Sequence, residues 1–146
     1  MREFRELDEQ LRERGCAVER DSDRALVTSE ESGSSWVLLS AGNWIQVAAS
    51  VLDREEVSDE ANRVALNEFL MRVHARYLGC RFGFDEDGAL VVMSDVYPEN
   101  VQAAHLIDVM NQMDSVTGAL LPLLRAAICS GQVPSDSEVD RAFSMA

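Results

Sequence analysis

The feature that constrains the fold most is a hairpin turn between two strand patterns in the second half of the chain. Residues 85–88 read Asp-Glu-Asp-Gly, and an Asp-Gly pair favours a tight turn between antiparallel strands. Strands are predicted on either side, over 80–84 and 89–97, and the second ends before Pro98. The second strand opens with a run that is apolar on both faces, which predicts that both of its faces are covered.

Two amphipathic helix patterns flank this hairpin. The first begins after Ser58, a candidate N-cap, and ends before Gly79. Its apolar positions recur at helical spacing: Ala61, Val64, Ala65, Leu66, Phe69, Leu70, Val73 and Tyr77. The second pattern starts at residue 99 or 100 and reaches residue 129, and Gly118 and Pro122 are expected to bend or interrupt it.

A short helix and a strand pair are predicted near the N-terminus. The apolar residues of the helix, at spacings of three and four, are Phe4, Leu7 and Leu11. Gly15 suits the position just after the end of a helix. Strand-like pieces follow on either side of a turn at residues 21–23, and a loop covers residues 31–35.

A further strand is predicted over residues 43–52, where apolar and polar residues alternate. The face expected to point to the core carries Ile45, Val47, Ala49 and Val51. An apolar run at 36–39 precedes this strand, and a tight turn at 41–43 joins the two. Together these pieces predict a meander of two or three antiparallel strands.

The order of these elements predicts the α+β class, with a sheet of about five strands in the order α-β-β-(β)-α-β-β-α. The chain has 146 residues, which suits one domain with a single core. We expect that domain to cover residues 1–130. Residues 131–146 are expected to form a loosely attached tail, in which Asp136 or Ser137 is a candidate cap for a last short helix.

The charge of the chain excludes several classes of partner. It has 26 acidic residues and 13 arginines with no lysine, so its formal net charge is −13. Nucleic acids and anionic membranes are bound by basic patches, and we expect neither as a partner. No apolar run approaches the length of a membrane span, and the N-terminus is too charged for a secretory signal. The sequence therefore predicts a soluble, cytoplasmic protein.

The negative charge is unevenly distributed. Residues 1–81 hold 16 acidic residues and 11 arginines, whereas residues 82–146 hold 10 acidic residues and 2 arginines. No cation lies between Phe82 and Leu124. Such a field favours basic or polar partners through electrostatic steering, and solubility alone is the alternative explanation.

No motif indicates a reaction, a metal or a cofactor. The cysteines and histidines, which are Cys16, Cys80, Cys129, His74 and His105, match neither a disulfide framework nor a zinc signature. The acidic turn at 85–88 does not continue into a calcium loop, because positions 5 and 12 are Ala89 and Val96. Nucleophile elbows and phosphate-binding loops are absent from the sequence. We predict no catalytic, cofactor or metal site, and a protein that is not an enzyme.

A resemblance to a known family rests on the segment that starts at Leu66-Asn67. In this segment a helix is followed by a glycine-containing link at Gly79, a strand, an acidic-Gly turn, a second strand and a long helix over 101–124. That order in a small acidic chain resembles the class I type III secretion chaperones, the Tir-chaperone or CesT-like family. It also resembles the YbjN-type proteins that share their fold and, more weakly, the YjfI-type proteins.

The resemblance implies a homodimer of α+β protomers, each with a twisted antiparallel sheet and helices packed on one side. Chaperones of this family hold the N-terminal segment of a secreted effector in extended form, without ATP. The dimer contact would use the helix at 59–77, with Leu66, Phe69, Leu70 and Val73. The contacts with a polypeptide partner would use apolar positions on the strands: Trp36, Leu38, Trp44, Val91 and Met93.

Two other functions stay open from the sequence. The chain is alternatively a YbjN-type or YjfI-type bacterial regulatory protein with no role in secretion. It is alternatively a small-ligand binder or an enzyme that uses the face of the sheet. The apolar strand residues assigned to a partner also have a simpler explanation, since the long helix and the tail would cover them in an ordinary core.

Overall fold

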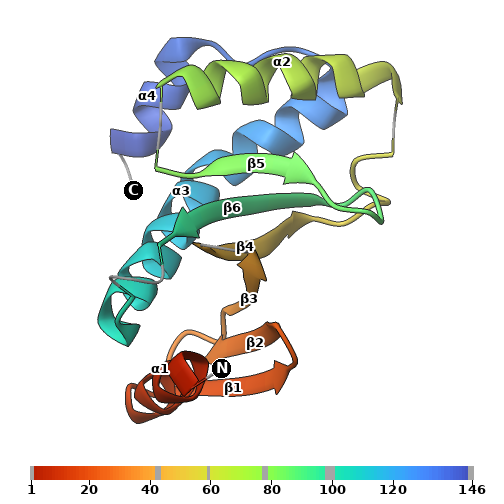
Figure 1. The fold of residues 1–146 in the computed structure, drawn as a ribbon. Helices are drawn as coiled ribbons and strands as arrows, with labels where there is room; N and C mark the ends of the chain where they lie inside the picture. Colours follow the sequence, from red (N-terminus) through yellow and green to blue (C-terminus); the bar gives the residue numbers. More distant parts are fainter. Residues whose placement is uncertain (1, 42–43, 59, 77–78, 98–100, 145–146) are drawn as a thin grey trace. The chain divides into compact units, whose positions relative to one another are not determined.

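The computed structural model describes residues 2–41, 44–58, 60–76, 79–97 and 101–144 (Figure 1). In chain order the elements are α1 (Arg2–Glu13), β1 (Cys16–Asp21), β2 (Arg24–Ser29), β3 (Ser35–Ala41), β4 (Trp44–Leu52), α2 (Glu60–Arg76), β5 (Arg81–Phe84), β6 (Leu90–Val96), α3 (Ala103–Ser130) and α4 (Asp136–Ser144). The strands form one sheet in the order β1-β2-β3-β4-β6-β5. The α+β class is confirmed, with six strands rather than about five, because the predicted meander has four strands.

The chain divides into two compact units, each made of two stretches. Unit 1 comprises Met1–Ala49 and Met93–Asn111, and unit 2 comprises Ser50–Val92 and Gln112–Ala146. β4, β6 and α3 therefore each have residues in both units. The single domain over 1–130 and the separate tail stay predictions.

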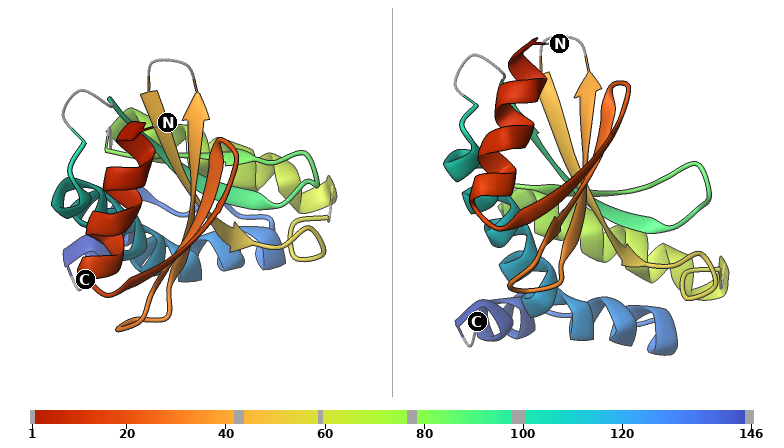
Figure 2. Two further views of the ribbon diagram at one scale, coloured as in Figure 1. Left: turned by 60° about the horizontal axis from the view of Figure 1, so that its bottom comes forward. Right: turned by 90° about the horizontal axis from the view of Figure 1, so that it is seen from below.

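One face of the β1–β3 meander belongs to the core of unit 1, and α1 packs against β1 (Figure 2). The strand register places Val18 opposite Val27, and Val27 opposite Trp36. All three are buried, as are Leu7 and Leu11 on the apolar side of α1. The spacing that predicted this helix thus marks the residues that pack against the strands.

β4 follows the predicted alternation only at its start. Ile45 and Val47 are buried as expected, but Val51 is half-buried and Leu52 is 1% exposed. Val47 and Leu52 are an odd number of residues apart, so they cannot share one face of a regular strand. The prediction that Val51 faces the core is therefore wrong. Residues 42–43 of the predicted turn lie outside the described residues.

The hairpin predicted at residues 85–88 is confirmed in unit 2. The Oδ1 atom of Asp85 accepts hydrogen bonds from the backbone N–H groups of Asp87 and Ala89, both at 2.9 Å. The Asp85 N–H in turn donates to the carbonyl of Ala89 at 3.0 Å. An aspartate at the start of the turn thus satisfies backbone donors that the sharp reversal leaves unpaired.

α2 buries a narrower stripe than the sequence predicts. Ala65, Leu66, Phe69, Leu70 and Val73 are buried, whereas Val64 is 73% exposed. Met71 is exposed to the same degree and lies two helical turns from Val64, on the side of α2 away from the core. Val64 was therefore wrongly assigned to the core, and Tyr77 lies outside the described residues.

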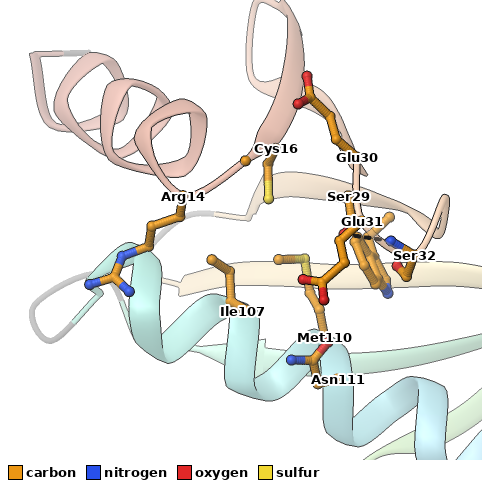
Figure 3. A pocket seen from close by; sticks show the side chains of 11 residues that line it. Arg14, Cys16, Ser29, Glu30, Glu31, Ser32, Ile107, Met110 and Asn111 are labelled. Atoms are coloured by element: carbon orange, nitrogen blue, oxygen red, sulfur yellow. Dashed lines mark hydrogen bonds between the residues drawn. The ribbon is translucent and has the colours of Figure 1, made fainter.

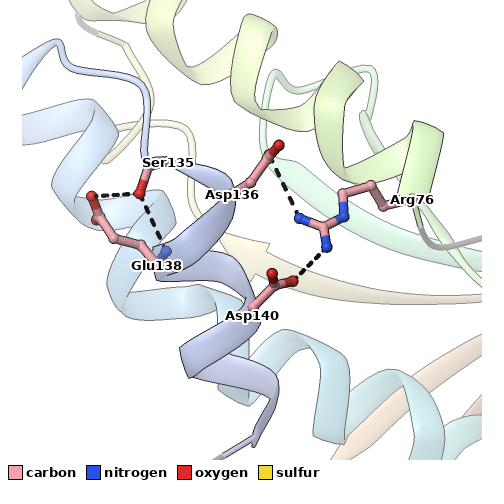
Figure 4. Close-up of polar contacts among 5 residues, drawn as sticks. All are labelled: Arg76, Ser135, Asp136, Glu138 and Asp140. Atoms are coloured by element: carbon pink, nitrogen blue, oxygen red, sulfur yellow. Dashed lines mark hydrogen bonds and ion pairs between the residues drawn. The ribbon is translucent and has the colours of Figure 1, made fainter.

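The end of the chain in unit 2 is more ordered than the composition of the tail suggests. α3 continues through Gly118 and Pro122, so the predicted interruption does not occur, and Leu120 and Leu124 are buried on either side of the proline. α4 is capped by Ser135 rather than by Asp136 or Ser137. The Ser135 hydroxyl accepts from the Glu138 N–H and donates to its carboxylate, both at 3.2 Å (Figure 4).

Two contacts within unit 2 attach α4 to the rest of that unit. Arg76 of α2 forms ion pairs with Asp136 at 3.6 Å and with Asp140 at 2.5 Å (Figure 4). Val139 is 3% exposed and lines a groove together with Phe69. The burial of Val139 and the two ion pairs of Arg76 are both expected to hold α4 against α2.

Candidate partner-binding surface

The second face of the meander in unit 1 is apolar and partly exposed. Leu26 of β2 lies opposite Val37 of β3, which lies opposite Ala48 of β4, and in the next row Leu39 lies opposite Gln46. We name this surface the exposed sheet face; it comprises Leu26, Val37, Leu39, Trp44, Gln46, Ala48 and Met93. Leu26 and Trp44 are each 41% exposed, and the other five are half-buried.

A side-chain contact joins β4 to β6 on this face. The Gln46 amide nitrogen donates to the Met93 sulfur at 3.6 Å. Methionine side chains are flexible and polarisable, and they are common on surfaces that bind partners of different shape. The exposed sheet face therefore extends over β2, β3, β4 and the part of β6 that belongs to unit 1.

Acidic residues lie beside the exposed sheet face on β1. Glu19 is opposite Leu26, so that apolar row ends on a carboxylate. In the next row Arg24 lies between Leu39 and the carboxylate of Asp21. Both carboxylates are exposed. An apolar surface with a negative rim favours a partner segment that carries apolar and basic side chains.

The structure separates the five predicted partner-binding residues. Trp36 and Leu38 are 2% and 3% exposed and lie on the buried face of the meander. Trp44 and Met93 belong to the exposed sheet face. Val91 is half-buried in unit 2, two residues before Met93 and thus on the same side of β6. Their roles as partner contacts stay predictions.

Leu26 and Leu39 on this face were not among the predicted partner-binding residues. The signal for Leu26 was present in β2, where Ala25 and Val27 alternate with Leu26 and Arg24. In β3 the run 36–39 is apolar throughout, so only the register with β2 and β4 shows which residues are buried.

The four residues predicted for the dimer contact are all buried within the chain. Leu66, Phe69, Leu70 and Val73 are between 0% and 5% exposed. Side chains so deeply buried have little surface left for a second chain. The homodimer stays a prediction, and a contact through α2 would use its exposed side, where Val64 and Met71 lie.

The free edge of β1 is partly occupied by the chain itself. β1 has a strand neighbour only on its β2 side, and the Gly15 carbonyl accepts from the Glu30 N–H on that side. Carbonyls alternate along a strand, so the Val18 carbonyl points to the free edge. There it accepts a hydrogen bond from Arg12 at 3.0 Å. A strand added at this edge would have to displace Arg12, which makes the exposed sheet face the more accessible surface.

The surroundings of the Cys16 and Cys80 thiols disfavour a role as nucleophiles. Burial and then the nearby Glu30 carboxylate raise the pKa of Cys16, and burial raises the pKa of Cys80. Both effects disfavour the thiolate, which is the reactive form.

Within the described residues, no three metal-binding side chains of the His, Cys, Asp or Glu type gather at one point. No helix of the described part of the chain has the length and apolarity needed to cross a membrane.

Comparison with known proteins identifies the fold. No protein-family model and no curated protein matches the chain. Among solved structures, the ExsC–ExsE complex matches with a TM-score of 0.60 at 17% identity, over 82% of this chain and 91% of that chain. The Yersinia pestis type III secretion chaperone SycH, in complex with a stable fragment of YscM2, matches with a TM-score of 0.52 at 14% identity, over 79% and 96%.

A third match is to a protein that is itself uncharacterized. An uncharacterized protein from Methanothermobacter thermautotrophicus has a TM-score of 0.60 at 12% identity, over 86% of this chain and 99% of that chain. These identities are low, so the matches show the fold alone. The fold is that of the type III secretion chaperones, as the order of elements in the sequence predicts.

Proposed function

We propose that this protein is a non-catalytic cytoplasmic chaperone that binds a segment of another polypeptide as a homodimer. The observation that carries the proposal is the exposed sheet face, because it presents Leu26 and Trp44 to solvent beside an acidic rim. The fold supports it, since similar structures include a secretion chaperone in complex with a fragment of another protein. The segment held here would be apolar and basic, which suits the net charge of −13.

The test is co-purification from the native host with a matched set of variants. Leu26→Asp and Trp44→Asp each place a charge on the exposed sheet face, and Ser137→Asp places the same charge at an exposed position of α4. We expect the wild type and Ser137→Asp to retain the same partner, and the other two to lose it. Circular dichroism checks that all three variants fold. Retention by every variant, or no partner at all, would contradict the proposal.

A regulatory role without secretion is the second candidate function. A similar structure that is an uncharacterized protein, and not a chaperone complex, is compatible with this role. The two roles predict different partner segments. A secretion chaperone binds the N-terminal segment of its partner, and that segment alone should suffice for binding. If binding instead needs an internal or folded region of the partner, the regulatory role is favoured.

The homodimer is tested separately by light scattering after size-exclusion chromatography. We expect the mass of two chains for the wild type. If α2 provides the contact, Val64→Asp and Met71→Asp should lower the mass to that of one chain without unfolding the protein, since both side chains are 73% exposed. A strictly monomeric wild type would overturn the dimer while leaving polypeptide binding to be judged by co-purification.

A further inference from the structure

A groove along α2 in unit 2 is occupied by α4 of the same chain. Phe69 and Val73 of α2 line its floor, and Val139 of α4 lies in it. These three side chains are between 1% and 3% exposed, so the groove is closed in this structure. The crevice that remains between the two helices has no room for a water molecule. The contact between α4 and α2 is therefore dry.

The rim of this groove is basic, whereas the chain as a whole has a net charge of −13. Arg72 and Arg76 of α2 line the rim, and Arg72 pairs with Glu68 of its own helix. Arg76 instead meets α4, through the ion pairs with Asp136 and Asp140 (Figure 4). These two aspartates are four residues apart and thus lie on one side of α4. The groove therefore fits a helix with an apolar stripe beside two carboxylates that are one turn apart.

α2 is attached to unit 2 by contacts that do not involve α4. Near its start, the Asn62 amide donates to the Ile128 carbonyl of α3. Near its end, His74 accepts from the Phe82 N–H of β5 at 2.8 Å. We therefore expect the floor of the groove to stay in place when α4 leaves it.

α4 itself is held by few contacts. Among its described residues only Val139 is buried, and Ala142 and Phe143 are half-buried. The side chains of Asp136 and Asp140 are 70% and 57% exposed, so their ion pairs with Arg76 are screened by solvent. A helix of nine residues is marginal on its own in water. A longer helix with the same pattern would therefore make the stronger contact with α2.

Two other hollows do not offer such a surface. A hollow of about 800 Å³ in unit 1 is lined by Cys16 and Met110 (Figure 3). These side chains are 7% and 1% exposed and belong to the packed core. A second hollow, beside α1, is lined by Arg20, which is already paired with Asp8. The groove on α2 differs from both because a separate short helix covers it.

We propose that the groove on α2 is a docking site for an acidic amphipathic helix of a partner protein, and that α4 closes this site in the free chain. Residues 131–135 connect α4 to α3, and so short a connection gives α4 an effective concentration on the order of millimolar at the groove. A partner helix displaces α4 by burying more apolar area on the same floor. The site is separate from the exposed sheet face, whose acidic rim favours a basic segment, and it does not depend on the proposed function.

The probe for the groove is a capped, fluorescent peptide with the sequence of residues 133–144, added to the full chain. We expect it to bind the wild type weakly, because α4 occupies the groove. Val139→Asp puts a charge into the dry contact and should release α4, so that the peptide binds at least about tenfold more tightly. Ser137→Asp puts the same charge at an exposed position of α4 and should bind the peptide as the wild type does. Fluorescence anisotropy measures the binding.

A second variant releases α4 without changing a buried residue. Asp136→Arg combined with Asp140→Arg sets two exposed cations against Arg76, so the peptide should again bind at least about tenfold more tightly than it binds the wild type. Arg76→Glu, added to Val139→Asp, should abolish binding of the peptide. The same protein should then bind a peptide that carries Asp136→Arg and Asp140→Arg.

Three results would overturn the proposal. The first is equal binding of the peptide to the wild type and to both released variants, and the second is binding that survives Arg76→Glu. The third is a wild-type dimer that Arg76→Glu dissociates, since the groove would then hold α4 of a second copy. Leu26→Asp, added to Val139→Asp, should leave peptide binding unchanged. If it abolishes binding, the peptide occupies the exposed sheet face, and the docking site on α2 fails while the proposed function stands.

Discussion

Arg20 of β1 holds Asp8 of α1 through two parallel hydrogen bonds, Nε to Oδ2 at 2.6 Å and Nη2 to Oδ1 at 2.7 Å. The Asp8 side chain is 7% exposed and that of Arg20 is 20% exposed. The guanidinium also lies over the Phe4 ring, 4.8 Å from its centroid. The hydrogen bond to Asp8 raises the pKa of Arg20, which thus stays charged. One side chain therefore joins α1 to the edge strand by charge and by stacking.

Asp8→Ala is expected to destabilise the protein by about 2–4 kcal/mol, because it leaves the Arg20 charge partly buried without its partner. Urea unfolding followed by circular dichroism measures the loss. Glu68→Ala is the control, since it removes an ion pair with Arg72 in which both side chains are more than half exposed. We expect the control to lose less than about 0.5 kcal/mol. Equal losses would show that the Asp8 pair adds no more than a surface pair.

His74 is expected to make stability depend on pH. Its Nε2 accepts a hydrogen bond from the Phe82 N–H at 2.8 Å, so this nitrogen must be unprotonated. Burial and then the nearby Arg81 charge lower the pKa of His74 from 6.5. The unfolded chain therefore takes up a proton at a higher pH than the folded chain does. The contribution of neutral His74 to the free energy of unfolding is complete above pH 6.5. It is lost as the pH falls through the lowered pKa of the folded chain.

His74→Gln should remove that pH-dependent contribution. Unfolding free energies measured between about pH 7 and pH 5 should fall less steeply for this variant than for the wild type. His105→Gln, at an exposed position of α3, is the matched control substitution. If His74→Gln and the wild type have parallel profiles, the hydrogen bond from Phe82 does not control the titration.

Patterns within a few residues predicted where the helices and strands lie. Which of their side chains are buried depends on the helices and strands that pack against them. The Asp-Gly pair and the spacing of Leu7 and Leu11 act within a few residues, so they could be interpreted from the sequence. Whether Val64 or Leu66 faces the core of unit 2 depends on which strip of α2 is packed. Both are apolar and two residues apart, so composition does not separate them.

The candidate surface was harder to predict than the fold for the same reason. Trp36, Leu38 and Leu39 follow one another in an apolar strand, and only the register decides that Leu39 lies on the exposed sheet face. A hollow in unit 1 is lined by Arg14, Glu31 and Met110, which are far apart in the sequence. A pattern that repeats over a few residues carries no information about which distant residues lie together in the folded chain.

α4 is expected to be protected from hydrogen exchange although it ends the chain. Val139→Ala should cost about 1–2 kcal/mol and increase exchange in α4, because Val139 is 3% exposed. Arg76→Ala should increase exchange by a smaller factor, since its side chain is 37% exposed and its ion pairs are screened by salt. A helix that exchanges fully in the wild type would instead support the prediction of a loosely attached tail.

Gly131, just after α3, should resist substitution for two separate reasons. Its φ is +70°, which disfavours any residue with a Cβ, and an added Cβ would lie 2.6 Å from the Oδ1 atom of Asn62. The Asn62 amide is itself engaged, because it donates to the Ile128 carbonyl at the end of α3. Gly131→Ala must therefore either strain the backbone or push Asn62 away from that carbonyl, which leaves a helix-end acceptor unpaired.

Gly33→Ala provides the matched control, since its φ is +74° and an added Cβ would meet nothing within 4 Å. We expect Gly33→Ala to lose about 1 kcal/mol from backbone strain alone. Gly131→Ala should lose about 1–2 kcal/mol more, because it adds the collision with Asn62. Chemical denaturation of both variants measures the difference. The double variant Gly131→Ala with Asn62→Ala should lose less than the sum of the two single variants, since the collision is then gone. Additive losses would show that Asn62 yields to the added methyl group without cost.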